Sequence, residues 1–317
     1  MNFWEKLKKP IFILAPMYGV TDTVFRQTVA SVGKPDVFFT EFTPVEGLLS
    51  PAKEKMLDTL KFIETERPMV AQIWGFDPNK FYGAAKLISK LGFDGIDINM
   101  GCPEKNPIKT GSCAALIKNP KLAKKIILAT IKGAGGLPVS VKTRIGFGKI
   151  ETQEWVKILL GTPIAALTLH LRTAKEKSDI SAHWEEMEKA VEIRQEMGSK
   201  TLLIGNGDVK SLKEAEEKCK LFGIDGIMIG RGIFENVWLF NPVMDPAKVT
   251  PKMKIDLLLK HLKLFQETYG NQKHFELMKK FVKCYINNFK GAAGYREKLM
   301  CAKSLQALIN LVSNKVK

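Results

Sequence analysis

The sequence lacks most features that identify secreted, membrane-spanning or metal-binding proteins. Its five cysteines are an odd number and include no C-x-x-C pair, so they indicate neither a disulfide framework nor a zinc site. The apolar run from Ile11 to Pro16 is too short for the core of a signal peptide or for a membrane span. We therefore expect reduced thiols, no metal and no membrane contact, in a cytoplasmic protein. We also expect a monomer.

Two nucleotide-binding signatures are also absent. No G-x-G-x-x-G follows the first apolar run, which disfavours an open doubly wound sheet as the fold. No G-x-x-x-x-G-K-[ST] is present, which argues against binding of a nucleoside triphosphate. A phosphorylated cofactor fits the chain better.

The sequence does contain the alternating pattern of repeated βα units. At 317 residues, 45% of them apolar and 26% charged, the chain is long enough for one large core and a smaller appendage. Short apolar runs recur at intervals of roughly 25 to 35 residues, with helical periodicity between them. This pattern predicts an α/β fold, a closed (β/α)8 TIM barrel. The predicted strands are Ile11–Met17, Val37–Phe42, Met69–Trp74, Gly95–Met100, Val139–Arg144, Ala166–His170, Thr201–Gly205 and Gly226–Ile229.

The pattern changes after Phe240, where prolines mark a linker and only helical periodicity follows. We expect a barrel domain over residues 1–241 and a helical domain over residues 242–317. The helices predicted in the second domain are Lys252–Tyr269, His274–Asn288 and Glu297–Asn314.

Positive charge is concentrated in that helical region. The chain has 49 basic and 33 acidic residues, a net charge of +16. From Asp245 to Lys317 there are 15 basic and 5 acidic residues, which gives a net charge of +10. Such an excess favours a polyanionic partner such as nucleic acid.

Polar and backbone-exposing residues follow nearly every predicted strand, where a barrel has its active site. The fourth strand ends in a Gly-Cys-Pro turn that presents the thiol of Cys102, a position better suited to chemistry than to packing. The glycine-rich turns after the last two strands suit a phosphate monoester. The strand-end residues are Pro16, Met17, Tyr18, Gln72, Asn99, Cys102, Lys142, Arg144, His170, Arg172, Asn206, Gly207, Asp208, Gly230 and Arg231.

Together, five motifs resemble those of the tRNA-dihydrouridine synthases, in the order of that family. They are Ala15-Pro16-Met17-Tyr18-Gly19-Val20-Thr21-Asp22 with Phe25-Arg26, Asp97-Ile98-Asn99-Met100-Gly101-Cys102-Pro103, Val141-Lys142-Thr143-Arg144-Ile145-Gly146, Gly205-Asn206-Gly207-Asp208, and Asp225-Gly226-Ile227-Met228-Ile229-Gly230-Arg231-Gly232. The tail is similar to the family's helical RNA-binding domain, in Met278-Lys279-Lys280 and Gly291-Ala292-Ala293-Gly294-Tyr295-Arg296.

The resemblance implies an FMN-dependent reduction of the uracil C5–C6 double bond in tRNA, with NADPH as the source of electrons. It implies a hydride from flavin N5 to C6 and a proton from Cys102 to C5. An unperturbed thiol, with a pKa of about 8.5, is mainly protonated at neutral pH and suits a general acid.

The resemblance also assigns roles to the other strand-end residues and to the tail. Pro16, Met17, Tyr18 and Gln72 would hold the flavin ring, with Lys142 balancing its charge and His170 beside it. Asn206, Gly207, Asp208, Gly230 and Arg231 would hold the ribityl chain and the phosphate. Asn99 and Arg144 would grip the uracil, while Arg172, Lys279, Lys280, Lys283, Lys290 and Arg296 would contact the RNA.

The chain departs from the family pattern near the sixth strand. Leu171 stands where glycine is usual, Ala174 where arginine is usual, and Ser178 where an aromatic residue is common. Cys113 is a second thiol close to Cys102 in sequence, but the Gly-Cys-Pro turn makes Cys102 the preferred acid.

Two other functions remain compatible with the sequence. One is an FMN barrel oxidoreductase that acts on a small pyrimidine-like substrate, which would not need the basic tail. The other is a tRNA-binding protein with an inert barrel, which would not need Cys102, Lys142 and the phosphate turns together.

Overall fold

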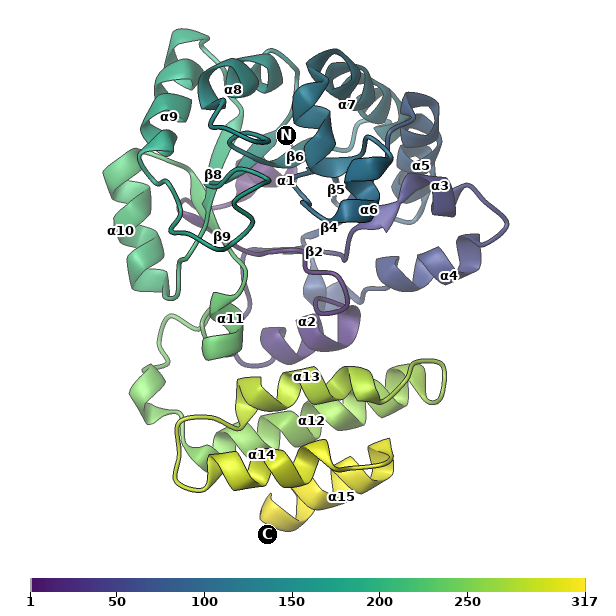
Figure 1. The fold of residues 1–317 in the computed structure, drawn as a ribbon, viewed down its shortest axis with the longest axis vertical. Coiled ribbons are helices and arrows are strands. Elements are labelled where there is room, and N and C mark those ends of the chain that lie inside the picture. Colours follow the sequence, from purple (N-terminus) through teal and green to yellow (C-terminus); the bar gives the residue numbers. More distant parts are fainter. Residues whose placement is uncertain (1, 317) are drawn as a thin grey trace.

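Eight parallel strands close into a barrel in the computed structural model, which describes residues 2–316 (Figure 1). All strand pairs are parallel, and pairing of β2 with β4 completes the ring. The predicted (β/α)8 barrel is confirmed. The eight strands of the ring are β1 (Ile11–Leu14), β2 (Val37–Phe39), β4 (Met69–Trp74), β5 (Gly95–Met100), β6 (Val139–Arg144), β7 (Ala166–His170), β8 (Leu202–Asn206) and β9 (Gly226–Ile229), and a short ninth strand, β3 (Thr43–Pro44), also pairs with β4.

Helices cover the outside of the barrel and begin and end at residues suited to those positions. Asp22, Asn119 and Ser211 each accept a backbone N–H in the first turn of the helix that follows. Gly135 and Gly223 end two helices in the left-handed conformation. The helices are α1 (Phe3–Lys6), α2 (Thr23–Ala30), α3 (Val45–Leu48), α4 (Lys53–Leu57), α5 (Pro78–Lys90), α6 (Lys105–Lys109), α7 (Pro120–Ala134), α8 (Thr152–Leu160), α9 (Glu186–Glu196), α10 (Leu212–Phe222) and α11 (Gly232–Glu235), with short 3₁₀ turns η1 (Asp58–Leu60), η2 (Glu64–Glu66), η3 (Cys113–Lys118) and η4 (Pro246–Lys248).

The strand predicted over Val37–Phe42 is interrupted after Phe39. The hydroxyl of Thr40 accepts the backbone N–H of Gln72 at 3.0 Å, so a side chain takes the place of a backbone acceptor there. β2 and the two-residue β3 both pair with β4 and together occupy one strand position of the barrel.

Four helices follow the barrel and lie below it in Figure 1. They are α12 (Pro251–Tyr269), α13 (Glu276–Tyr285), α14 (Ala292–Met300) and α15 (Leu305–Val316). The single helix predicted over Glu297–Asn314 is wrong. Ser304 begins a new helix, because its hydroxyl accepts the N–H of Ala307 at 3.1 Å. No helix within residues 2–316 has the length and apolar character needed to cross a bilayer.

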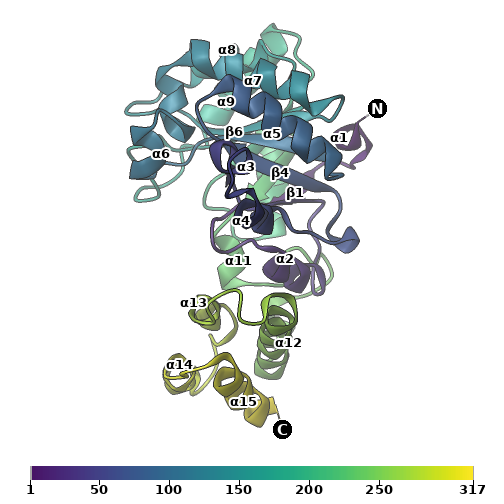
Figure 2. The ribbon, with the colours of Figure 1, turned by 90° about the vertical axis from the view of Figure 1, so that its right-hand side faces the viewer.

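Helix α2 lies between the barrel and the four-helix bundle in both views (Figures 1 and 2). Its Phe25 ring stacks on Phe281 of α13 at 5.0 Å and lies 5.7 Å from the His261 ring of α12. Burial lowers the pKa of His261 to about 3, so the ring is neutral, and Tyr285 shares a 2.9 Å hydrogen bond with its Nδ1. Neutral, fully packed rings make this contact a continuous apolar core.

A buried ion pair fixes α2 on the barrel side. Arg26 and Glu66 are both fully buried, and the guanidinium donates to Glu66. The same guanidinium donates to the carbonyls of Thr21 and Lys61 at 2.6 Å, while Glu66 also accepts from Thr23 at 2.6 Å. Every charge in the pair is therefore matched by several hydrogen bonds, as burial requires.

We expect Glu66→Gln to lower the free energy of unfolding by about 3 kcal/mol, because it leaves the buried Arg26 charge uncompensated. The measurement is the urea midpoint followed by circular dichroism. Glu64→Gln is the matched control, since this carboxylate is 80% exposed in its pair with Arg67. Equal midpoints for the two variants would contradict the assigned role of the buried pair.

Candidate active site

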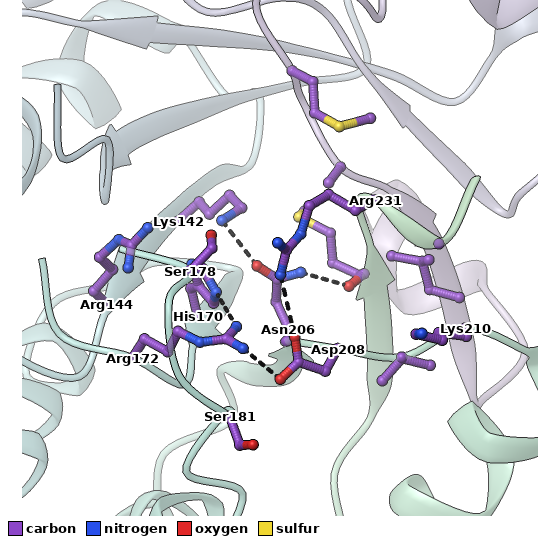
Figure 3. Close-up of a pocket in the computed structure, with 18 of the residues that line it drawn as sticks. Lys142, Arg144, His170, Arg172, Ser178, Ser181, Asn206, Asp208, Lys210 and Arg231 are labelled. Atoms are coloured by element: carbon purple, nitrogen blue, oxygen red, sulfur yellow. Dashed lines mark hydrogen bonds and ion pairs between the residues drawn. The ribbon is translucent and has the colours of Figure 1, made fainter. Parts of the chain in front are cut away.

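The carboxyl ends of the strands surround a cavity of about 880 Å³, a volume typical of ligand sites (Figure 3). Cationic side chains dominate its wall, and the acidic residues there are Asp179, Asp208 and Glu235. The strand-end residues of the sequence that line it are Pro16, Met17, Lys142, Arg144, His170, Arg172, Asn206, Gly207, Asp208, Gly230 and Arg231.

Strand register explains why these side chains meet. Arg144, His170 and Asn206 are paired across β6, β7 and β8, so they stand at one level of the barrel. Lys142 Nζ donates to Asn206 Oδ1 at 3.2 Å, and Asn206 Nδ2 donates to the Met228 carbonyl at 2.7 Å. Burial, followed by the nearby Arg144 charge, lowers the pKa of Lys142 to about 8. Lys142 is thus still mainly protonated at neutral pH.

A chain of polar contacts links the ends of β7, β8 and β9. Arg172 donates to Asp208, whose carboxylate also lies 3.3 Å from Arg231 (Figure 3). Arg172 Nη1 lies 3.2 Å from His170 Nε2; because arginine can only donate, this nitrogen accepts. Burial and the surrounding cations hold the pKa of His170 well below its usual value, so the imidazole is neutral and its proton is on Nδ1.

The Gly-Cys-Pro turn is held by two residues of the predicted site. Asn99 Oδ1 accepts the backbone N–H groups of Gly101 and Cys102, each at 3.0 Å. Arg144 Nε donates to the Gly101 carbonyl at 2.8 Å. The amide oxygen of Asn99 therefore holds the turn, and the predicted contact of Asn99 with uracil stays a prediction. Cys102 itself does not line the cavity. Arg144 does, so its bond to Gly101 places the turn beside the cavity wall.

Cys102 has an unusual partner in Cys113. The Cys113 thiol hydrogen-bonds to the Cys102 sulfur, and this contact is the largest cause that lowers the pKa of Cys102 to about 7. Cys113 is fully buried, and burial together with the Cys102 contact raises its own pKa well above the usual thiol range. Near neutral pH Cys102 exchanges its proton readily, whereas Cys113 keeps its own. The sequence placed Cys113 near Cys102 but gave no sign of this contact.

A second polar group lies beneath the turn. Gln72 is fully buried and donates to Asp97 at 2.7 Å, and it accepts from Asn99 at 3.0 Å. Ser140 donates to the other Asp97 oxygen at 2.6 Å. Gln72 does not line the cavity but positions Asn99, and its predicted contact with the flavin ring stays a prediction. Asp97 in an apolar strand was the sequence signal for this network.

The remaining predicted residues lie outside the main cavity. Tyr18 is 69% exposed beside Phe42. Lys280 and Lys283 line a second cavity of about 750 Å³ between α11 and α13, together with Arg231. Lys279 pairs with Glu276 at 2.8 Å, and Arg296 donates to the Ile286 carbonyl. Some of their hydrogen-bond donors are therefore already used within the bundle.

The three departures from the family pattern follow β7, the sixth predicted strand, and they differ in their surroundings. Leu171 is fully buried, and its backbone bonds to Asn206 and His183. Ala174 is buried, whereas Ser178 lines the cavity. Leucine at position 171 is therefore accommodated by the core.

We predict that the alkylation rate of Cys102 by iodoacetamide rises with a midpoint near pH 7, because the thiolate is the nucleophile. Cys113→Ala removes the donor and moves this midpoint up toward the ordinary value of about 8.5. Cys113→Ser keeps a donor and serves as the matched control. Mass spectrometry of the Cys102 peptide measures the rate, and an unchanged midpoint in Cys113→Ala would contradict the assigned contact.

Comparisons with known proteins agree on one family. The family model described as dihydrouridine synthase matches residues 13–317. The chain is 45% identical over 307 residues to the probable tRNA-dihydrouridine synthase of Staphylococcus aureus strain COL, covering 96% of this chain and 92% of that protein. It is 42% identical over 306 residues to the probable tRNA-dihydrouridine synthase 2 of Bacillus subtilis strain 168, covering 96% and 93%.

Solved structures with little sequence similarity share the fold. A 2-naphthoyl-CoA reductase complex has a TM-score of 0.57 at 11% identity and is matched over 73% of this chain and 49% of that one. Morphinone reductase in complex with tetrahydroNAD has a TM-score of 0.51 at 12% identity, over 72% and 84%. The barrel is therefore a recurrent one, while the family is set by the nearly complete sequence match: this chain belongs to the dihydrouridine synthase family.

Proposed function

We propose that this protein reduces the C5–C6 double bond of uridines in tRNA, with FMN in the main cavity and NADPH as the reductant. The observation that carries the proposal is a cationic cavity beside a thiol whose pKa is about 7, in a chain of this family. Names of the relatives supply the tRNA substrate.

The donor set of the cavity suits a flavin phosphate. Lys142, Arg172 and Arg231 give it positive charge, and guanidinium groups bind phosphate oxygens well. An added Cβ at Gly207 would lie 2.7 Å from the Ala182 Cβ, so glycine keeps space at this turn. We assign Asn206, Gly207, Gly230 and Arg231 to the ribityl phosphate, and Lys142 to the ring. When bound, the flavin supplies the electrons for the reduction.

Cys102 provides the proton that the saturated C5 atom requires. With a pKa of about 7, close to half of the protein molecules carry the thiol at neutral pH. A donor with a pKa near the working pH transfers its proton and recovers it efficiently. The protonated Lys142 stabilises negative charge on the uracil ring before C5 is protonated.

The helical bundle contributes binding energy for the RNA. A uridine inside a folded tRNA must leave its stack to enter the cavity, at a cost of a few kcal/mol. Lys280 and Lys283 line the cavity between barrel and bundle, next to Arg231 at the edge of the main site. With Lys279, Lys290 and Arg296 they are assigned to phosphates, which position an RNA by shape rather than sequence.

We predict that purified protein with FMN and NADPH adds 2 Da to specific uridines of an unmodified tRNA transcript, and that Cys102→Ala loses this product. Cys301→Ala, an exposed thiol elsewhere, should retain it. Because the acid is the protonated thiol, the wild-type rate should fall as the pH rises through about 7. Mass spectrometry of the nuclease digest measures the product.

The possible outcomes separate this function from its competitors. Bound FMN and NADPH oxidation without modified tRNA would favour a small pyrimidine-like substrate. Failure to bind any flavin would remove the enzyme assignment and favour a tRNA-binding protein.

We predict that Arg231→Gln weakens FMN binding by about tenfold or more, because a charge-assisted phosphate contact is lost. Riboflavin, which has no phosphate, should bind both proteins equally. Lys200→Gln removes an exposed charge near the opposite end of the barrel and should leave FMN affinity unchanged. Flavin fluorescence titration of the apoprotein measures these affinities; an equal loss for riboflavin would contradict the phosphate assignment.

A further inference from the structure

Positive charge is concentrated in a second segment of the chain, far in sequence from the basic tail. Residues 105–150 contain ten lysines and arginines and no acidic residue, a net charge of +10. The tail reaches the same net charge only over 73 residues, Asp245 to Lys317. Lys142 and Arg144 of this segment line the main cavity, which leaves eight lysines without a role in the site.

Seven of these lysines form a group that we name the rim cluster. Its members are all exposed: Lys105, Lys109, Lys118, Lys121, Lys124, Lys125 and Lys149. Among residues 2–316, no carboxylate lies within 4.0 Å of any of them. Elsewhere on the barrel surface, lysines such as Lys189 and Lys218 do pair with carboxylates. The rim cluster is therefore an uncompensated cationic surface.

The fold gathers the cluster beside the mouth of the barrel. Helix α6 begins at Lys105, three residues after Cys102, and the turn η3 packs against α6, α7 and β5. Lys118 lies 3.8 Å from the centre of the Phe147 ring, which joins η3 to the loop after β6. Loops after the strands and the first turns of the following helices share the mouth end of such a barrel. Cys102 is thus at the edge of this surface.

The tail presents its own lysines on the same side of the molecule. In Figure 2, α6 of the barrel and α13 of the bundle both project to the left. Lys280 and Lys283 of α13 are exposed. An anionic ligand that contacts both surfaces must cross the mouth of the barrel between them.

We propose that the rim cluster is a second phosphate-backbone contact surface for structured RNA, on the side of the mouth opposite the helical bundle. The inference rests on the proposed function, because it takes tRNA as the polyanion. Lysines without acidic partners suit a polyphosphate, since each can displace a condensed counterion. Contacts on both sides of the mouth hold the RNA across Cys102, and a short RNA cannot make both sets.

The test compares two triple variants with the same change of charge. The rim variant is Lys105→Gln, Lys109→Gln and Lys121→Gln. The control variant is Lys8→Gln, Lys200→Gln and Lys220→Gln, which are exposed lysines that precede strands or end α10, toward the opposite end of the barrel. Fluorescence anisotropy gives the dissociation constant for an unmodified tRNA transcript between 50 and 200 mM KCl, without turnover.

We expect the rim variant to lose about tenfold in tRNA affinity. The slope of the logarithm of its affinity against the logarithm of the KCl concentration should be smaller by about one for each lost phosphate contact. The control variant should keep the tRNA affinity and the salt slope of the wild-type protein, apart from the small effect of its lower net charge. Affinity for a short stem-loop that cannot span the mouth should be the same for both variants.

Equal tRNA affinity and equal salt slopes for the rim and control variants would overturn the proposal. Unchanged tRNA binding with lost binding to phosphatidylserine vesicles would overturn it in favour of a membrane surface. Since binding is measured without catalysis, a wild-type protein that binds tRNA through the rim but forms no dihydrouridine would remove the proposed function alone.

Discussion

The parallel pairing of β5 with β6 is the constraint on which the active site depends. It sets Asn99 beside Lys142 and brings Arg144 within 2.8 Å of the Gly101 carbonyl. Asn99 holds the two N–H groups of the turn, and Gln72 in turn holds Asn99. A one-residue slip in this pairing would reverse the faces of these side chains. The strand pairing that closes the barrel therefore also positions the Cys102 thiol.

The hydrogen-bond network around the Gly-Cys-Pro turn has buried groups below the turn and an accessible thiol above it. Asp97, which burial gives a pKa of about 6, is satisfied by Gln72 and Ser140 below the turn. Cys102 above it is partly exposed and can exchange its proton. Rigid hydrogen bonds below and an exchangeable proton above suit the acid role that we propose for Cys102.

Sequence patterns predicted the strands well because each is a compact apolar run, whereas contacts made across the fold were not visible. The break after Phe39 depends on a hydroxyl that meets the backbone of β4, and no local pattern reports it. Ser304, by contrast, is a local helix-start residue, but the helix predicted over Glu297–Asn314 ran through it. The pairing of Cys102 with Cys113 depends on how η3 folds back on β5. Sequence patterns placed Asn99 and Gln72 at strand ends, but they did not reveal the hydrogen bond that joins the two side chains.

Positive charge is concentrated both in the main cavity and on the surfaces around its mouth. Lys142, Arg144, Arg172 and Arg231 line one cavity, and Asp208 compensates only two of these cations directly. Burial lowers the pKa of Lys142 and of His170, and repulsion by the neighbouring cations lowers both further. An anionic ligand relieves this repulsion, so its binding stabilises the folded protein by mass action. Under the proposed function, the cations near the mouth would then attract RNA toward a site whose own charge the ligand has already reduced. The outer lysines would determine where the RNA backbone lies.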